Sequence, residues 1–321
     1  VKKDYYISMK KNSNSKKILS LFLIYYKQFK ILNFSILFLP LLNFISSLFK
    51  LNKKINLKNY NNENKTIKLN ADNYVTHFRS TLFFLKEKEV RFFIDKYLEK
   101  NSIFFDIGAN IGIFSLYSAI RKNADVYSFE PEYSNLSLLK ENIINSELTD
   151  KIFPYSLAIG NKSSITNLHV ADFTPGAAVS SISNNEIDIT DEGFDVIWKE
   201  GVMEITLDKV CESLKITPEM IKIDTDGNEK NVLLGSENTL KNEKLKFIIM
   251  EKPSNQEKLE FCNNCLKKFN FNETQISDKR NSFWIRKWFK YYLNKKILLL
   301  NTRNMKKKGI KVLFIYPNTF G

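Results

Sequence analysis

Two acidic residues that each end an apolar run are the residues of this chain best placed to do chemistry. Asp106 ends one run and is followed by Gly108 and Gly112, and Glu130 ends a second run, Val126–Phe129. An apolar run, a glycine turn and apolar residues at helical spacing predict a buried strand, a tight turn and a helix start. Because the carboxyl ends of parallel strands meet at one edge of a sheet, both acids are expected where open α/β sheets bind ligands.

The order of acid and glycine bears on which cofactor fits this edge. Dinucleotide folds place G-x-G-x-x-G after the strand and hold a pyrophosphate at the helix N-terminus. Here the spacing is G-x-x-x-G, and Asp106 precedes the first glycine. A carboxylate there would repel a pyrophosphate, but it suits a cofactor with a cationic amino-acid tail and no phosphate. S-adenosylmethionine is such a cofactor, and Glu130 would accept hydrogen bonds from its two ribose hydroxyls. The alternative is a glycine turn in another kind of α/β protein.

A second group of acids follows the predicted strand Met220–Ile223. Asp224, Asp226 and Glu229 lie within six residues, which is costly at a strand end unless the acids are hydrogen-bonded, bound to metal or functional. Transfer of a methyl group to a hydroxyl needs a base to take the proton, and Asp224 is the first candidate because it lies nearest the strand end. The alternative is that Asp224 and Glu229 cap the helix that starts near residue 228.

The motifs as a series resemble the FkbM family of S-adenosylmethionine-dependent methyltransferases, in the family's order, over about residues 75–290. They are Phe105–Gly112, Phe129–Pro131 with Asn135, Asn142–Asn145, Leu157–Gly160, Thr206–Asp208, Ile221–Glu229, Leu233–Gly235 and Ile248–Glu251. Many methyltransferases share the opening glycine motif, whereas the block ending at Glu229 is more specific. Asp226 stands where the family usually has Glu, which keeps the charge but shortens the reach.

The resemblance implies an α/β class I methyltransferase fold, a Rossmann-like seven-stranded sheet with helices on both faces. The cofactor contacts predicted are Asp106, Gly108, Ala109, Asn110, Gly112, Glu130, Pro131 and Ala158. The catalytic residues predicted are Asp224, Asp226 and Glu229, with no metal site. The implied reaction is O-methylation of a hydroxyl on a sugar, glycolipid or other small metabolite. One alternative is an inactive methyltransferase-like scaffold in a membrane-associated glycan-assembly complex, which the intact cofactor motifs disfavour. Another is a nicotinamide dehydrogenase, which the missing G-x-G-x-x-G disfavours.

The charge is unevenly distributed, which divides the chain into three parts. The formal net charge is +14, yet residues 1–70 carry fourteen Lys against two acids, and residues 279–321 carry twelve basic residues and no acid, so the part between them is acidic. The predicted parts are a basic, apolar N-terminal arm and linker (1–70), the methyltransferase domain (71–290) and a basic tail (291–321) that could start a further α/β domain. Basic arms suit anionic lipid or another polyanion, or they reflect a general excess of Lys and Asn.

Residues 18–49 are strongly apolar and are predicted to form a helical arm that contacts a membrane surface. A true span or a plain packing helix are the alternatives, since the longest uncharged run is near the minimum for crossing a bilayer. The expected location is therefore cytoplasmic, in association with the inner face of the membrane. A nucleic acid partner is not expected, because the Asn/Asp-Pro-Pro-aromatic motif of base amino-methyltransferases and the Pro-Cys nucleophile of cytosine-C5 enzymes are both missing.

The remaining segments complete the expected domain. Residues 52–70 are rich in Asn and Lys and are predicted to be a linker, and residues 81–100 are predicted to be a helix. The polar stretch 161–204 interrupts the alternation of strands and helices and is a candidate substrate lid. Two segments, 271–276 and 282–286, are expected to pair as a closing antiparallel hairpin. Cys262 and Cys265 lie on an apolar helical stripe, which favours a core position over a zinc or redox site.

Overall fold

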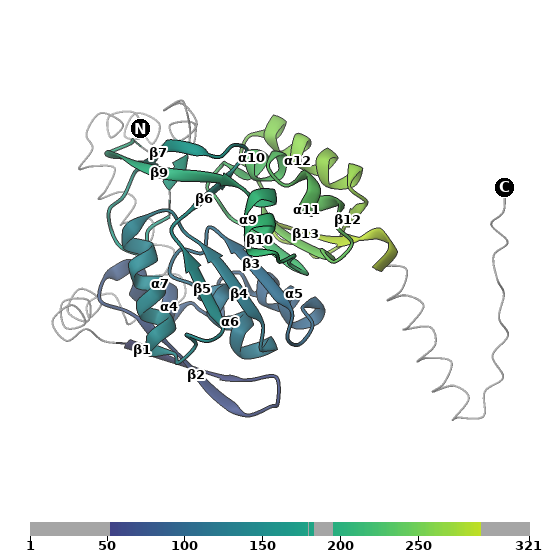
Figure 1. Ribbon diagram of the computed structural model, residues 1–321. Helices are drawn as coiled ribbons and strands as arrows, with labels where there is room; N and C mark the ends of the chain where they lie inside the picture. The colour runs from purple at the N-terminus through teal and green to yellow at the C-terminus, as the bar shows by residue number, and fades with distance from the viewer. Residues whose placement is uncertain (1–51, 179, 183–194, 290–321) are drawn as a thin grey trace, which may run out of the picture.

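A seven-stranded sheet forms the centre of the computed structural model, which describes residues 52–178, 180–182 and 195–289 (Figure 1). Its strand order is β12-β13-β11-β10-β3-β4-β5. The five parallel strands are β3 (Ile103–Ile107), β4 (Asp125–Phe129), β5 (Ile152–Tyr155), β10 (Met220–Ile223) and β11 (Phe247–Glu251). The edge pair β12 (Phe271–Glu273) and β13 (Asn281–Arg286) is antiparallel, so the predicted closing hairpin is confirmed.

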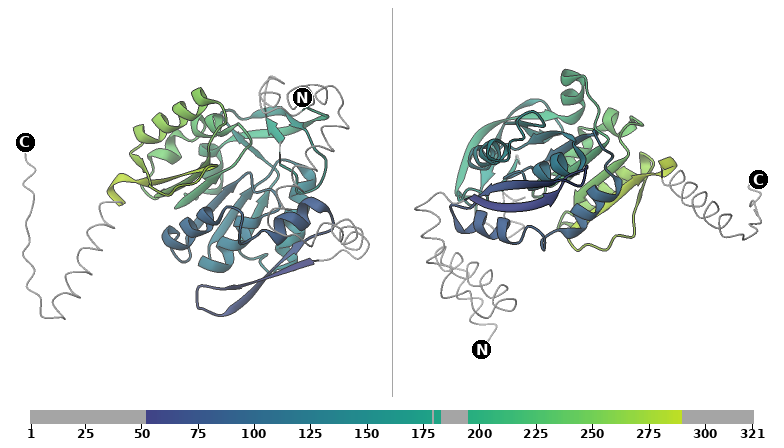
Figure 2. Two further views of the ribbon diagram at one scale, coloured as in Figure 1. Left: turned by 180° about the vertical axis from the view of Figure 1, so that it is seen from behind. Right: turned by 90° about the horizontal axis from the view of Figure 1, so that it is seen from below.

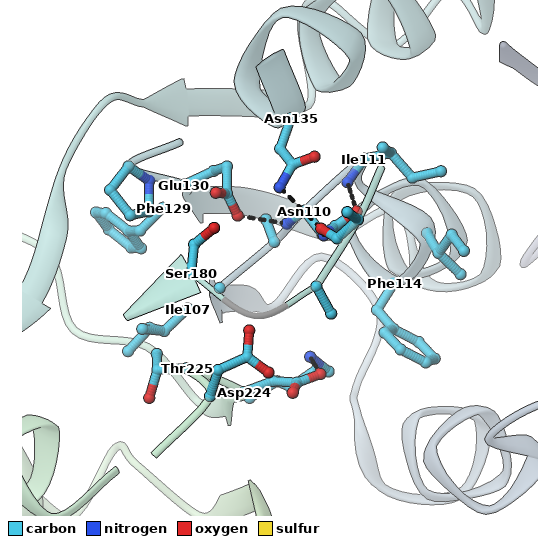
Figure 3. Close-up of a pocket in the computed structure, with 18 of the residues that line it drawn as sticks. Ile107, Asn110, Ile111, Phe114, Phe129, Glu130, Asn135, Ser180, Asp224 and Thr225 are labelled. Atoms are coloured by element: carbon cyan, nitrogen blue, oxygen red, sulfur yellow. Dashed lines mark hydrogen bonds and ion pairs between the residues drawn. The ribbon is translucent and has the colours of Figure 1, made fainter. Parts of the chain in front are cut away.

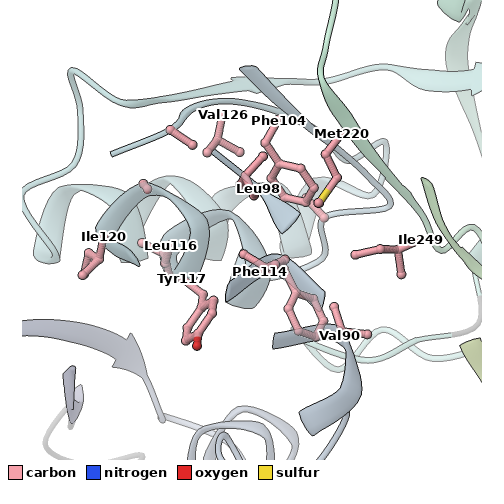
Figure 4. Packing of buried hydrophobic residues seen from close by; sticks show 14 of the residues in the cluster. Val90, Leu98, Phe104, Phe114, Leu116, Tyr117, Ile120, Val126, Met220 and Ile249 are labelled. Carbon is pink, nitrogen blue, oxygen red and sulfur yellow. The ribbon is translucent and has the colours of Figure 1, made fainter. Parts of the chain in front are cut away.

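Helices cover both faces of this sheet, as predicted. On one face lie α5 (Lys88–Tyr97), α6 (Ile113–Lys122) and α7 (Tyr133–Asn145), and on the other lie α9 (Leu207–Leu214), α10 (Glu229–Leu234), α11 (Glu237–Lys241) and α12 (Gln256–Lys268). Successive strand residues alternate between the faces: Phe104 packs with the first helix layer (Figure 4), and Phe105 packs with the second. Because both faces are buried, the central strands read as continuous apolar runs.

The segment predicted to be a linker is instead a β-hairpin, β1 (Asn52–Lys58) paired antiparallel with β2 (Asn64–Asn70). It lies across the outer side of α6 and α7 (Figures 1 and 2). Apolar residues alternate with Lys and Asn, and one face is buried: Ile55, Leu57, Ile67 and Leu69. The backbone N–H of Asn70 also donates to the side chain of Asn142 in α7 at 2.7 Å. The hairpin is therefore part of the domain, because period-two burial outweighs its polar composition.

The helix predicted over residues 81–100 is shorter than expected, because α5 begins only at Lys88. A separate helix, α4 (Tyr74–Thr81), capped by Asn73, precedes it, and a turn joins the two. Between them, the guanidinium of Arg91 donates to the carbonyls of Phe84 and Lys86 at 2.7 and 2.8 Å. These bonds hold the intervening residues as a turn that overhangs the carboxyl end of the sheet.

The polar stretch 161–204, the candidate substrate lid, is largely β-structure where it is described. It contributes to a second sheet of order β6-β9-β7-β8, formed by β6 (Ala158–Gly160), β7 (Ser164–Val170), β8 (Ser180–Ile182) and β9 (Trp198–Thr206). This small sheet stands above the carboxyl ends of β4 and β5 (Figure 1). Its placement brings part of β8 to the edge where ligands were expected.

Three other predictions concern the ends of the chain and the cysteines. The apolar stretch 18–49 and the basic tail from 291 onward lie outside the described residues. Within the described part, none of the helices has the length and apolar character needed to cross a membrane. Cys262 is fully buried on α12 within the second helix layer and is a free thiol, so the core position predicted for it is confirmed.

Candidate active site

A cleft opens above the carboxyl ends of β3, β4 and β10. Its empty volume, including the solvent at its opening, is about 1210 Å³. Figure 3 shows Glu130 and Asn110 on one side of it and Asp224 with Thr225 on the other. Its walls come from the loops after these three strands, from α4 and the turn that follows it, and from β6 and β8. Six of the cofactor residues predicted from the sequence line the cleft: Gly108, Ala109, Asn110, Glu130, Pro131 and Ala158.

Gly108 allows the loop after β3 to pass against the end of β10. Its φ is +75°, and a Cβ built there would lie 1.8 Å from the backbone oxygen of Asp224. The N–H groups of Gly108 and Ala109 both donate to the carbonyl of Phe129, at 2.9 and 3.0 Å. The loop is thereby tied to β4 on one side and packed against β10 on the other, so no side chain is tolerated at this position.

Gly112 has a packing role and does not line the cleft. It precedes α6 with a φ of +84°, and a Cβ there would lie 2.3 Å from the side chain of Leu139 in α7. The cofactor contact predicted for Gly112 is thus replaced by close approach between two helices. Only glycine provides both the left-handed backbone and this space.

Glu130 places a buried carboxylate at the cofactor side of the cleft. One oxygen accepts the N–H of Asn110 at 2.7 Å and the other accepts the N–H of Glu132 at 3.0 Å. Burial raises the pKa of Glu130 to about 8, although these two backbone hydrogen bonds lower it. A carboxylate has about four acceptor positions. With two used by the backbone, about two remain for donors in the cleft.

Two asparagines fix the segment before β8 across the top of this cofactor side. The side-chain amides of Asn110 and Asn135 both donate to the carbonyl of Ala177, at 2.8 and 3.2 Å. The side-chain oxygen of Asn135 accepts the N–H of Gly176 at 2.7 Å. Asn135 thus belongs to the site although it was not among the predicted cofactor residues. Its only sequence signal was its place in the family pattern.

Asp106 lies beneath the cleft and does not line it. It accepts a hydrogen bond from the hydroxyl of Ser115 at 2.6 Å and lies 3.8 Å from the ammonium of Lys222. Burial raises the pKa of Asp106, while Lys222 and Ser115 act in the opposite direction. These surroundings indicate that Asp106 holds Lys222, a residue only 2% exposed. The direct cofactor contact predicted for Asp106 stays a prediction, since its Oδ1 has no hydrogen-bond partner within the described chain.

Lys222 connects Asp106 to Asp224 on the acceptor side of the cleft. Its ammonium donates to Asp224 at 2.6 Å. Burial alone would raise the pKa of Asp224, but Lys222, a hydrogen bond from Glu251 and the charge of Arg280 hold it well below its usual value. Burial and the neighbouring Asp224 raise the pKa of Glu251, while its hydrogen bond with Arg280 lowers it. Asp224 is consequently an ionised carboxylate that faces the cleft.

Asp226 lines the cleft, whereas Glu229 does not. Glu229 is fully buried, and one of its oxygens accepts from the N–H and the hydroxyl of Thr225, each at 3.0 Å, and from the N–H of Gly227 at 3.3 Å. These bonds hold the two residues on either side of Asp226, whose φ is +48°. Glu229 thus braces the loop before α10, whose N-cap Asn228 makes no side-chain cap hydrogen bond, so the capping alternative is not what these bonds show and the catalytic role stays a prediction. Burial raises the pKa of Glu229 to about 7.

Sequence comparison connects this geometry to known proteins. The family described as "Methyltransferase FkbM domain" matches residues 106–274, more than half of the chain. The chain belongs to the FkbM methyltransferase family. It is a methyltransferase that depends on S-adenosylmethionine. The matched range begins at Asp106 and includes the cleft residues of β3, β4 and β10, so the family pattern and the cleft coincide.

Individual relatives of this FkbM methyltransferase are distant. The hexuronic acid methyltransferase AglP of Haloferax volcanii is 26% identical over 157 residues, which are 48% of this chain and 56% of that protein. The chain thus matches little more than half of that relative's length. Among solved structures, precorrin-6y C5,15-methyltransferase from Geobacter metallireducens is 11% identical with a TM-score of 0.36, over 63% of this chain and 88% of the other. M. capricolum TrmK, in complex with S-adenosyl-homocysteine, is 11% identical with a TM-score of 0.34, over 61% of this chain and 66% of the other.

The described residues of this FkbM methyltransferase fit S-adenosylmethionine on structural grounds. The two acceptor positions left on Glu130 match the two ribose hydroxyls of the cofactor. The N–H groups of the loop from Gly108 to Gly112 are all engaged within the chain, to Phe129, Glu130, Asn110 and Ala109, so this loop offers none of them to a pyrophosphate. The residues that the sequence did not indicate come from the α4 turn and the β12–β13 loop: Arg79, Lys86 and Arg280. They precede or follow the family motifs and have no pattern of their own.

Proposed function

We propose that this enzyme transfers the methyl group to an oxygen atom, a hydroxyl of a sugar, glycolipid or other small metabolite. The observation that carries the proposal is that Asp224 and Asp226 line the same cleft as Glu130. An acid that faces the transferred group is what a hydroxyl acceptor needs. The name of the distant relative, a hexuronic acid methyltransferase, supports a sugar-type acceptor.

The cofactor end of the cleft is assigned to the residues around Glu130. Its carboxylate would accept the two ribose hydroxyls, and the backbone of Gly108, Ala109 and Asn110 would lie along the rest of the cofactor. Pro131 and Ala158 line the same end. When bound, S-adenosylmethionine supplies an electrophilic methyl group on a sulfonium sulfur. The remaining work of the chain is to place an acceptor oxygen in line with that methyl group and to receive a proton.

Asp224 is the residue to which we assign the acceptor proton. Its low pKa makes it a weak base for a free hydroxyl. During transfer, however, the acceptor oxygen gains positive charge as the new C–O bond forms, and its proton becomes strongly acidic. A carboxylate that is already ionised and held in place by Lys222 at 2.6 Å can then take the proton without reorganising. Asp226 lies beside it and can hydrogen-bond a second group of the acceptor.

Methyl transfer by the full chain to a panel of acceptors tests this function. Sugar nucleotides, free sugars and glycolipids are incubated with methyl-labelled S-adenosylmethionine, and products are identified by mass and by sensitivity to alkali, which separates ethers from esters. Asp224→Asn should abolish most of the transfer. The matched control is Asp125→Asn, which also breaks a Lys–Asp pair (2.9 Å to Lys151) but lies at the opposite end of the sheet.

Two outcomes would contradict the proposal. Transfer to amine or thiol acceptors but to no hydroxyl would show that the acceptor atom is not oxygen. A chain that binds neither S-adenosylmethionine nor its product would favour the scaffold alternative instead.

A further inference from the structure

Cationic side chains gather at the acceptor side of the cleft, and they differ in how many hydrogen-bond or ion-pair partners they have within the described chain. Five line it within the described residues: Arg79, Lys86, Arg91, Lys222 and Arg280. The last three are engaged. The guanidinium of Arg91 binds two backbone carbonyls, Lys222 binds Asp224, and Arg280 contacts Glu251 at 2.6 Å and Glu87 at 3.4 Å. The remaining two are the exception.

Arg79 and Lys86 keep most of their donors free. The Nε of Arg79 donates to the carbonyl of Gly176 at 2.6 Å, and within the described chain its two terminal nitrogens have no hydrogen-bond partner or ion pair. The ammonium of Lys86 likewise has neither among those residues. Both side chains are partly buried. Burial lowers the pKa of both, and the charge of Arg79 lowers the pKa of Lys86 further. The charges of Glu87 and Asp224 act in the opposite direction on both cations, but they offset burial only in part, since both pKa values stay lowered. A bound anion would compensate the two neighbouring cations further.

The position of this pair bears on which ligand group it would meet. The charges that act on Lys86 include Arg280 and Asp224, which belong to the β10 and β11 side of the sheet. Glu130 and Ala158 follow β4 and precede the small sheet, on the other side of β3. Arg79 also donates to the carbonyl of Gly176, next to the segment that crosses the cofactor side, so the pair lies over the cleft between Glu130 and Asp224 and within reach of the charge of Asp224. We assign a ligand group bound there to the molecule that receives the methyl group.

We propose that Arg79 and Lys86 bind a compact oxyanion, a carboxylate or a phosphate, carried by the acceptor. The substrate class is then an acidic or phosphorylated sugar-type molecule and not a neutral one. The planar guanidinium of Arg79 presents two parallel donors of the kind that recognise carboxylate and phosphate, and Lys86 adds a point charge. This inference rests on the proposed function, because it assumes that the acceptor occupies the Asp224 side of the cleft.

Direct binding to the full chain loaded with S-adenosyl-homocysteine tests the inference without turnover. Calorimetric titrations use D-glucuronate as the carboxylate probe, glucose 6-phosphate as the phosphate probe and glucose as the neutral match. At least one anionic probe should bind about ten-fold or more tightly than glucose, and which one does so distinguishes carboxylate from phosphate. Lys86→Gln should remove that preference, about ten-fold in Kd, while Lys86→Arg should keep it.

Lys86→Gln decides the test because its ammonium makes no hydrogen bond within the described chain, so the fold does not depend on it. Arg79→Gln is the second variant, read together with its melting temperature because Arg79 also holds Gly176. Lys88→Gln is the matched control, since that side chain is 73% exposed and does not line the cleft.

Three results would overturn the inference: no anionic probe binding more tightly than glucose, an unchanged preference in Lys86→Gln, or an equal loss in Lys88→Gln. A loss of S-adenosyl-homocysteine affinity in Lys86→Gln, with probe binding intact, would also overturn it by assigning the pair to the cofactor's own carboxylate. The proposed function fails separately, by the absence of methyl transfer to hydroxyls.

Discussion

Replacing Glu130 with Gln tests the cofactor end of the cleft, because the change removes the charge and nearly preserves the shape. In the wild type the carboxylate has about two acceptor positions left after the N–H groups of Asn110 and Glu132 are bound. A hydrogen bond to a charged group contributes about 1.5–3 kcal/mol, against about 0.5–1.5 kcal/mol for a neutral pair. Two ribose hydroxyls would therefore lose about 2 kcal/mol in total, which weakens binding of S-adenosyl-homocysteine about 30-fold.

The same group makes cofactor binding depend on pH. Burial raises the pKa of Glu130 to about 8, so below that pH the ligand-free wild type carries a neutral acid there, as Gln does. Wild-type affinity should fall as pH is lowered from 9 to 6 and approach that of the Gln variant. The variant has no titratable group at this position, so its own profile reports the titration of the ligand and of the protein's other groups, Glu229 among them. Calorimetry on both proteins over this range isolates the contribution of Glu130.

Glu132→Gln is the matched control for this experiment. Glu132 is a buried Glu that also accepts two backbone N–H groups, from Ser134 at 2.9 Å and Asn135 at 2.7 Å, but it does not line the cleft. Its substitution should leave affinity at pH 9 unchanged, and below that pH it should shift the profile slightly, because the charge of Glu132 raises the pKa of Glu130. Equal affinity of wild type and Glu130→Gln at pH 9, or an equal loss in Glu132→Gln, would refute the assignment of Glu130 to the ribose.

Three further substitutions have distinct expected results. Asp224→Asn should lower kcat by about 10²-fold or more in steady-state assays and leave cofactor affinity nearly normal; full turnover would place the base elsewhere. Glu229 has a pKa raised from 4.5 to about 7, so its stabilising contribution is present below pH 4.5 and lost as pH rises through 7. Glu229→Gln should thus gain about 3 kcal/mol relative to wild type between pH 4.5 and 8, measured by urea unfolding, and a pH-independent difference would contradict this. Gly108→Ala should cost about 1–3 kcal/mol in backbone strain alone and abolish cofactor binding, unlike Gly201→Ala, where the added methyl meets nothing within 4 Å.

The parts of the site that the sequence predicts well are those fixed by local order along the chain. Gly108, Asn110 and Glu130 all follow apolar runs directly, so their place at the carboxyl ends of β3 and β4 is a consequence of strand formation. The closing hairpin was also predicted, because a methyltransferase of this class usually ends its sheet with one and two short segments stood at the right place in the chain. In each case neighbours in sequence are neighbours in space.

What the sequence could not give are contacts set by packing between distant segments. Asp106 follows the strand pattern as well as Glu130 does, yet it turns to Ser115 and Lys222 beneath the cleft. The direction in which its side chain points depends on its pairing with a lysine 116 positions later in the sequence. The β1–β2 hairpin was hidden by its Lys and Asn residues, which occupy the exposed face. Arg79 reaches the cleft only because a turn held by Arg91 brings α4 over the sheet.

Two carboxylates in one cleft have opposite pKa shifts, and the neighbouring cations account for the difference. Burial raises the pKa of Glu130, and its partners in the described chain are backbone N–H groups. Burial acts in the same direction on Asp224, but Lys222 and the charge of Arg280 reverse the shift. Lys222 is only 2% exposed, and two acids, Asp224 and Asp106, offset the cost of burying its charge. Asp106 lies beneath the cleft at 3.8 Å from the ammonium, so the first acid of the opening motif acts on the acceptor side through Lys222.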